Sequence, residues 1–146
     1  MMNELRETSR ALADILRDLA GTEGLRLPVT GDCMTPWVKS GAQVQVTAPR
    51  RVYLPGDVVA VLNGERGLLL HRIIGGYWRR GAWRWLTQAD AASGPDNAVT
   101  GACIVGKVSG GDCDPALVHI PLRHRLWATG RFVRFVFRRL GQRAIT

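Results

Sequence analysis

The sequence predicts a mainly β fold, in which an antiparallel β-body is flanked by an N-terminal amphipathic helix and a basic amphipathic C-terminal helix. Short apolar or alternating runs, separated by Gly, Pro and Asn turn signals, fill the middle of the chain and indicate many short strands. Leucine and isoleucine recur at helical spacing near the N-terminus, and aromatic residues interleave with arginines near the C-terminus. The expected organisation is an N-terminal helix at 1–24, a β domain at 25–110, and a linker with the basic helix at 111–146.

The 146 residues are expected to form one domain, because 46% apolar and 22% charged residues are ordinary for a globular chain of this length. No secretory signal is visible, nor a run of about eighteen apolar residues, so the expected location is the cytoplasm. Three cysteines without zinc-type spacing argue against a disulfide framework and against a metal site. We therefore expect no metal and no cofactor.

The N-terminal helix is expected over residues 4–20, where apolar and charged residues alternate at helical spacing, and it ends near Gly21. Its apolar face is expected to pack on the body or on another copy of the chain, which leaves a homo-oligomer open. Residues 25–30 then lead into a turn at 31–36. Residues 42–47 alternate with period two, which predicts a half-buried strand.

Two hairpins are predicted at the centre of the body. Residues 58–62 are apolar enough for a strand covered on both faces, and Asn63-Gly64 signals a tight turn after it. The remaining elements follow in order: a return strand at 68–74 ended by Gly75-Gly76, a second hairpin at 77–86 around Gly81-Ala82, a polar loop at 87–98, and a closing strand at 104–108.

Positive charge is concentrated in the C-terminal segment. The formal net charge is +8, seven arginines lie between Arg123 and Arg143, and no acidic residue follows Asp114. The segment from about Leu122 is predicted to be a basic amphipathic helix. Two interpretations stay open: the helix lies peripherally on the anionic inner face of a membrane, or its aromatic stripe packs on the body. Nucleic acid is the weaker interpretation, because no recognised binding motif accompanies the charge.

Cys33 and His71 are the candidate nucleophile and base. Cys33 lies in the turn after Gly31, where glycine lets the backbone bend tightly; the alternative is a small buried apolar residue. His71 lies in an apolar strand, where an imidazole is costly to bury without a partner; the alternative is a structural histidine. Asp90 and Asp96 lie in the polar loop that follows, and either could orient the imidazole.

In series, five blocks of the sequence resemble the signal-peptidase-like S24/S26 peptidases. The family's blocks are a nucleophile box, a Gly-Asp-x-Val strand, a Lys or His followed by Arg, a Thr-Lys-Gly-Asp loop with a second Asp, and a Gly-Lys-Val end. Here they read Gly31-Asp32-Cys33-Met34-Thr35-Pro36, Gly56-Asp57-Val58-Val59, His71-Arg72-Ile73-Ile74-Gly75, Thr87-Gln88-Ala89-Asp90 with Asp96, and Gly106-Lys107-Val108. The resemblance covers roughly residues 27–108 and implies a signal-peptidase/LexA-like β-body that forms a peptidase domain.

The resemblance implies an endopeptidase that cleaves a peptide or protein precursor, with Cys33 in place of the family's serine nucleophile and His71 in place of its base. It also implies that Gly31 and Met34 adjoin the oxyanion and substrate site. Trp37, next to this box, is the tryptophan expected to touch substrate. Cysteine with histidine is chemically coherent, since an imidazolium can hold a thiol as thiolate. The chain departs from the family in this cysteine and in its Thr-Gln-Ala-Asp loop, and no transmembrane anchor is visible.

Two other functions stay open. The altered loop and the unusual cysteine also suit a non-catalytic peptide-binding protein that keeps the family's groove without turnover. Self-cleavage, as in repressor-type members of the superfamily, would have Ala20-Gly21 as a formal candidate bond. That bond lies about a dozen residues before Cys33, which is at most roughly 40 Å of extended chain.

Overall fold

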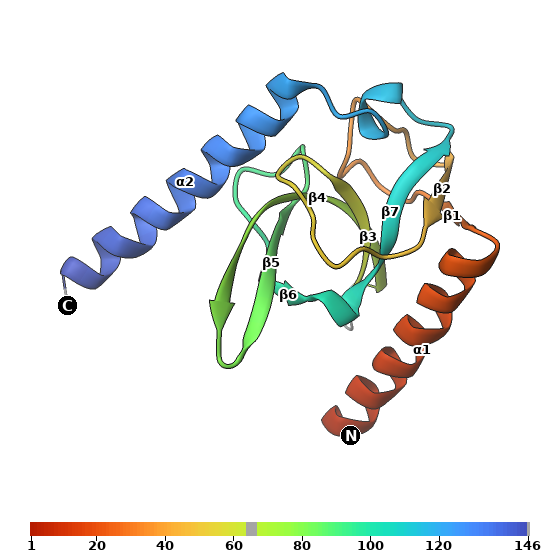
Figure 1. Ribbon diagram of the computed structural model, residues 1–146, viewed down its shortest axis with the longest axis horizontal. Coiled ribbons are helices and arrows are strands. Elements are labelled where there is room, and N and C mark those ends of the chain that lie inside the picture. The colour runs from red at the N-terminus through yellow and green to blue at the C-terminus, as the bar shows by residue number, and fades with distance from the viewer. Residues whose placement is uncertain (64–66, 146) are drawn as a thin grey trace.

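The computed structural model describes residues 1–63 and 67–145, which form a mixed α and β fold (Figure 1). Within these residues one antiparallel sheet has seven strands in the order β1-β2-β7-β3-β4-β5-β6. The prediction of an antiparallel body between two helices is confirmed, but "mainly β" understates the helices, which hold 21 and 23 residues. The elements are α1 (Met2–Thr22), β1 (Leu25–Pro28), β2 (Gln43–Thr47), β3 (Val58–Asn63), β4 (Gly67–Arg79), β5 (Ala82–Gln88), β6 (Val99–Thr100), β7 (Ile104–Gly111) and α2 (Leu122–Ala144), with short 3-10 turns at Gly101–Cys103 and Pro115–Leu117.

Strand β3 is buried on both faces, as its uninterrupted apolar run predicts. Val58 and Ala60 face a core that also contains residues of β2 and β7, whereas Val59 and Val61 face a second core around Trp85. Each fully buried side chain of this size contributes about 1.5–3 kcal/mol of hydrophobic stabilisation. Strand β3 is therefore the layer between two cores, and it fixes the position of its neighbour β4.

The prediction that Gly75-Gly76 ends the return strand is wrong. Strand β4 continues through both glycines to Arg79, with a register shift between Ile73 and Gly75. A Cβ added to Gly75 would collide with the ring of Phe132 in α2, and one on Gly76 would collide with Trp83. Because glycine has no side chain, the aromatic rings can pack directly against the backbone of β4 at these two positions. Glycine within a strand therefore allows a close approach here and does not end the strand.

Both predicted hairpins have paired strands, but only the turn of the second lies fully within the described residues. Strands β3 and β4 pair from Val58 opposite Arg72 to Asn63 opposite Gly67, and Gly64 of the predicted turn lies outside the described residues. Strands β4 and β5 join through Arg80 and Gly81, which both have positive φ, as a tight type I′ turn requires. The polar loop is shorter than expected, because β5 extends to Gln88 and the two-residue strand β6 pairs with it beyond the loop.

Helix α1 packs on the body. Ala13 and Ala20 are buried, and the Arg17 guanidinium donates hydrogen bonds to the carbonyls of Gly101 and, at 2.8 Å, Ile104. The expectation that this helix packs on the body is confirmed: Leu16 packs against the same core as the two alanines. The other large apolar side chains of its predicted face stay exposed: Leu5, Leu12, Ile15 and Leu19.

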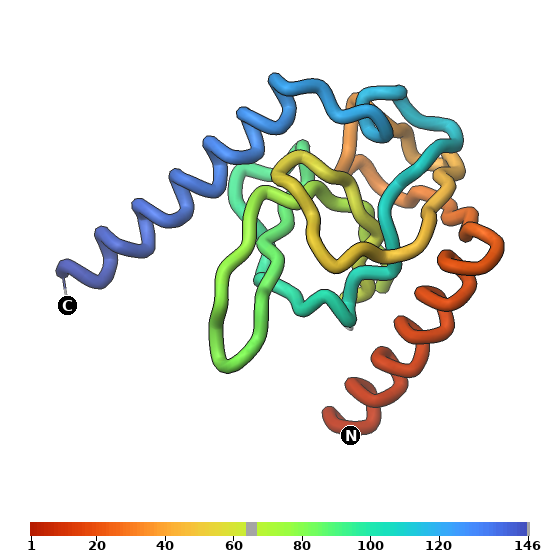
Figure 2. The backbone as a smooth tube through the Cα atoms, in the orientation of Figure 1, coloured from red at the N-terminus to blue at the C-terminus, as the bar shows by residue number. Residues whose placement is uncertain are grey.

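Helix α2 divides its apolar residues between the body and solvent. Ala128 is fully buried, Phe132 packs on Gly75, and Phe135 stacks on Tyr77 with ring centroids 6.1 Å apart. Of the two interpretations left open for the aromatic stripe, packing on the body is thus confirmed for these two rings. The two helices follow different sides of the β-body and end far apart (Figure 2). No helix within the described ranges combines the length and apolar character needed to cross a bilayer.

The start of α2 carries a buried histidine whose titration should affect stability. His124 packs on Trp37 with ring centroids 4.8 Å apart, and its Nδ1 is buried without a hydrogen-bond partner among the described residues. Burial, and then the charges of Arg72 and Arg123, lower the pKa of His124 below 6.5. Between the two pKa values the unfolded chain binds more protons than the native chain, so this group makes the free energy of unfolding fall as pH drops through that window.

We expect the fall in the free energy of unfolding at lower pH to be smaller in His124→Leu, because leucine cannot take up a proton. Urea denaturation at about pH 7 and about pH 5 measures it, because the change between the two conditions contains the proton uptake of this histidine. An equal change in the variant and the wild type would contradict the prediction.

Candidate active site

Cys33 lies in a compact series of turns between β1 and β2. Gly31 has φ of +82°, a left-handed conformation that favours glycine. The Thr35 N–H donates to the Asp32 carbonyl at 3.1 Å, and the Trp37 N–H donates to the Met34 carbonyl at 2.9 Å. These bonds hold the backbone around a partly buried Cys33 thiol. The backbone N–H groups of Cys33 and Met34 make no hydrogen bond among the described residues.

The turn at Cys33 is tied to the loop after β5. The Cys33 carbonyl accepts a hydrogen bond of 3.1 Å from the Ala91 N–H. That loop, residues 89–98, carries both Asp90 and Asp96. The turn of the nucleophile candidate is therefore joined by a hydrogen bond to the loop that carries both carboxylate candidates.

His71 and Asp96 form a pair. His71 is 4% exposed in β4, and its Nδ1 contacts Asp96 Oδ2. Thr87 supports the carboxylate, since its hydroxyl lies 3.4 Å from Asp96 Oδ2 and its carbonyl accepts from the Asp96 N–H at 2.9 Å. A carboxylate on Nδ1 fixes the neutral ring with its proton there, which leaves Nε2 as the basic nitrogen. This is the arrangement that a general base requires.

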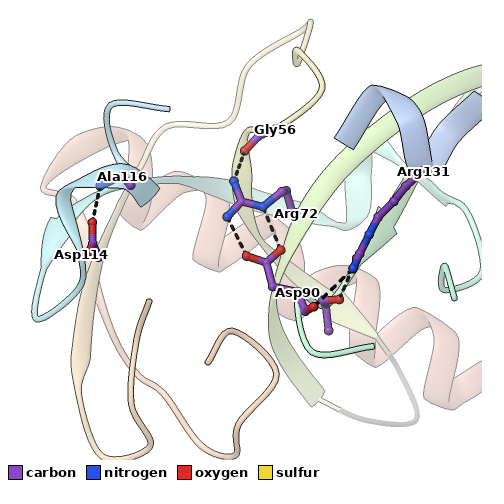
Figure 3. A network of polar contacts seen from close by, with 7 residues as sticks. Gly56, Arg72, Asp90, Asp114, Ala116 and Arg131 are labelled. Carbon is purple, nitrogen blue, oxygen red and sulfur yellow. Dashed lines mark hydrogen bonds and ion pairs between the residues drawn. The ribbon is translucent and has the colours of Figure 1, made fainter. Parts of the chain in front are cut away.

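Asp90 has a different partner. The Arg72 guanidinium donates two hydrogen bonds to the Asp90 carboxylate, of 2.8 and 2.7 Å, and a third of 2.8 Å to the Gly56 carbonyl (Figure 3). Arg131 of α2 donates to the backbone carbonyls of Ala89 and Asp90 at 3.4 Å. The structure thus separates the two carboxylates that the sequence left as alternatives: Asp96 contacts His71, and Asp90 holds the loop.

The nucleophile and the base are not in direct contact. Among the described residues no hydrogen bond joins the Cys33 thiol to the His71 ring. The thiol borders a groove that is also lined by Leu68 and Leu70 of β4, whereas His71 is the next residue along that strand. Catalytic hydrogen bonds are often long before substrate binds and shorten in the complex. The geometry therefore supplies an oriented base on the strand that borders the groove, without an assembled Cys-His pair.

The groove beside Cys33 lies between two strand edges, and we call it the Cys33 groove. Within residues 1–63 and 67–145, strand β1 pairs only with β2, and the first residues of β4 pair only with β3, so each has an edge without a strand partner there. The groove has a volume of about 40 Å³, room for a small side chain. Its lining comprises Leu27, Pro28, Val29, Thr30, Cys33, Met34, Val44, Ala60, Leu68, Leu69 and Leu70.

The other residues that the sequence singled out lie around this groove in different ways. Met34 is 1% exposed, belongs to the core and forms part of the groove lining. Gly31 shapes the turn, and its N–H donates to the Ser40 hydroxyl at 3.2 Å. Trp37 is not in the groove lining and instead packs on His124. The structure therefore places Met34, but not Trp37, in the wall of the groove.

Sequence reasoning missed two supporting residues, Arg72 and Thr87. A signal for Arg72 was present, because a guanidinium in a buried strand needs a carboxylate partner. With His71 and Arg72 adjacent and two aspartates following, each basic group could have been assigned one acid. Nothing in the sequence marked Thr87 as the support for Asp96.

The other two cysteines lack such surroundings. Burial, and then the charges of Asp114 and Asp112, raise the pKa of the Cys113 thiol. The Cys103 sulfur lies 3.8 Å from the Thr100 hydroxyl, beside the second core. In the part of the chain that the structure describes, no cluster of three or more His, Cys, Asp or Glu residues could hold a metal ion.

A scan of the chain against protein-family models finds no match, and a search of curated proteins finds no significant match. A functional assignment therefore depends on the residues and contacts described above.

Proposed function

We propose that this protein is a cysteine endopeptidase of the signal-peptidase-like kind, which cleaves a peptide or protein precursor. The observation that carries the proposal is the contact of Asp96 with His71. His71 lies on strand β4, which together with Cys33 borders a groove between two unpaired strand edges. An extended peptide can bind by adding its backbone to such edges. The small volume beside Cys33 favours a small substrate side chain at that position.

The proposed reaction uses three side chains. His71 Nε2 takes the Cys33 proton, and the thiolate Sγ attacks the scissile carbonyl carbon. The free N–H groups of Cys33 and Met34 are available to stabilise the oxyanion. The C–N bond then breaks, and His71 gives its proton to the leaving amine. Water, deprotonated by His71, hydrolyses the thioester, and the proton returns to the Cys33 sulfur.

A non-catalytic peptide-binding protein is the second candidate function. The observation that favours it is the absence of a Cys33–His71 hydrogen bond in the described residues. Self-cleavage at Ala20-Gly21 is disfavoured, because this bond lies within helix α1 and Ala20 is buried in the core. Cleavage there would need the helix to unwind and leave the body.

The first experiment measures alkylation of Cys33 across pH, with the modified site read by mass spectrometry. We expect rapid labelling of Cys33 near neutral pH and labelling about tenfold slower or more in His71→Ala, which removes the base that ionises the thiol. His119→Ala is the matched control, since His119 is exposed and distant in sequence from the site. Slow labelling with an ordinary thiol pH profile in all three proteins would exclude the peptidase mechanism and favour the binding protein.

A further inference from the structure

A second pocket, which shares no lining residue with the Cys33 groove, lies between the β4–β5 hairpin, the loop before β6 and helix α2. Its volume is about 340 Å³. Four arginines line it, and we call it the arginine pocket: Arg79, Arg80, Arg84 and Arg139. Asp96 also borders this pocket, but it is already engaged by His71 and Thr87.

The arginines of this pocket lack anionic partners. Among the described residues no ion pair involves Arg79, Arg80, Arg84 or Arg139. The Nε of Arg84 is buried and has no hydrogen-bond partner there. An unsatisfied buried donor is unfavourable, and clustered like charges repel each other. A bound anion would offset the repulsion, and guanidinium groups suit phosphate oxygens well.

An apolar groove adjoins the arginine pocket and shares Tyr77, Arg79, Phe135 and Arg139 with it. We call it the aromatic groove; its volume is about 230 Å³. The residues that only this groove has are mostly apolar: Trp78, Phe132, Val136, Leu140 and Arg143. Trp78 is 68% exposed, so a large indole stands at the rim. The two cavities together offer an anion site next to an apolar site.

The outward face of α2 continues this apolar surface. Val136 and Leu140 of the aromatic groove lie one helical turn from Val133 and Phe137, and all four are exposed. No acidic residue follows Asp114, so nothing on this helix opposes a negatively charged surface. Exposed apolar side chains flanked by arginines are typical of helices that lie in the interface of an anionic bilayer.

We propose that the arginine pocket binds the phosphate headgroup of an anionic phospholipid, while the aromatic groove and the outward face of α2 contact its glycerol and acyl region. This site lies outside the Cys33 groove, although Asp96 of the proposed catalytic machinery borders it, and it would place the protein at a membrane surface. A soluble phosphate would use the arginines but leave the apolar surface exposed. A nucleic acid would likewise gain nothing from the aliphatic side chains of α2.

Co-sedimentation of the full chain with vesicles tests the proposal. We expect binding to phosphatidylcholine vesicles that contain phosphatidylglycerol, and little binding to pure phosphatidylcholine. The double variant Arg84→Gln/Arg139→Gln should weaken binding roughly 10- to 30-fold, because each arginine near an anionic surface contributes about 1 kcal/mol. Phe137→Ser/Leu140→Ser should weaken it about tenfold through lost apolar burial, and both side chains are exposed, so the fold is retained.

The matched control is Arg6→Gln/Arg10→Gln, which removes the same two charges from exposed positions on α1. It should bind like the wild type, and an equal loss in this control would overturn the proposal by showing a nonspecific charge effect. Undiminished vesicle binding in Phe137→Ser/Leu140→Ser, with glycerol phosphate as an effective competitor, would overturn it in favour of a soluble anion. Tighter binding of single-stranded RNA than of vesicles, lost in the Arg84/Arg139 variant, would overturn it in favour of nucleic acid.

Discussion

Asp96→Asn is expected to lower the rate of peptide cleavage about 10³- to 10⁴-fold while the protein stays folded. The physical reason is the contact between Asp96 Oδ2 and His71 Nδ1. An amide in place of the carboxylate can present an N–H to the ring, which would stabilise the tautomer that has its proton on Nε2 and therefore cannot accept the thiol proton. The amide also removes the charge that stabilises the imidazolium formed when Cys33 ionises.

The measurement uses a peptide that the wild type cleaves, selected from a library with small residues at successive positions. The rate of Cys33 alkylation across pH gives a second measurement that needs no substrate, and a merely structural role for Asp96 would not change its pH profile. Asp114→Asn is the matched control, since Asp114 is exposed and caps the short turn at Pro115–Leu117. Cleavage by Asp96→Asn at the wild-type rate would exclude Asp96 as the orienting group.

The sequence predicts the strands well where burial dictates a single pattern. The run at 58–62 has apolar side chains on both faces, and β3 does lie between two cores. Gly75-Gly76 misled the prediction, because glycine marks both chain reversals and close approaches of other side chains. For Gly75 the deciding ring is Phe132, more than fifty residues later in the chain, and for Gly76 it is Trp83 on the paired strand β5. Information at the range of Phe132 is absent from a local pattern.

The site was predictable in residue type but not in pairing. Cys33, His71 and two aspartates could be named from the sequence, yet Asp90 and Asp96 lie in one loop and differ only in how that loop folds. The choice is made by Arg72, which binds Asp90 and leaves Asp96 for His71. The pattern of α2 was likewise ambiguous, because its apolar residues serve both a buried and an exposed face. Helical periodicity shows that such faces exist without showing what covers each one.

The Arg72–Asp90 ion pair should also make a large contribution to the stability of the fold. Arg72 and Asp90 side chains are 1% and 5% exposed, so Arg72→Met would leave a carboxylate buried without its counterion. We expect this change to lower the free energy of unfolding by about 3–5 kcal/mol. Because domains are commonly stable by only about 5–15 kcal/mol, the variant should be close to unfolding at physiological temperature. Urea denaturation followed by tryptophan fluorescence measures the loss.

Replacing both partners separates the cost of an unpaired charge from the value of the pair. The double variant Arg72→Met/Asp90→Leu should recover most of the lost stability, since apolar residues of similar size often replace a buried ion pair at little cost. Glu4→Gln, which removes an exposed pair with the N-terminal amine, is the control and should change stability by about 0.5 kcal/mol or less. A loss in the double variant equal to the sum of the single losses would contradict a coupled pair.

The same double variant tests whether the Arg72–Asp90 pair positions the proposed active site. In this variant the loop would lose the bidentate contact between Arg72 and Asp90. Asp90 directly precedes Ala91, whose N–H donates to the Cys33 carbonyl, and it lies six residues before Asp96. If the variant is stable but its loop is less constrained, Cys33 should therefore be alkylated more slowly near neutral pH, although neither substituted residue is hydrogen-bonded to the thiol. Labelling at the wild-type rate and pH dependence would show that Arg72 and Asp90 stabilise the fold without positioning the catalytic residues.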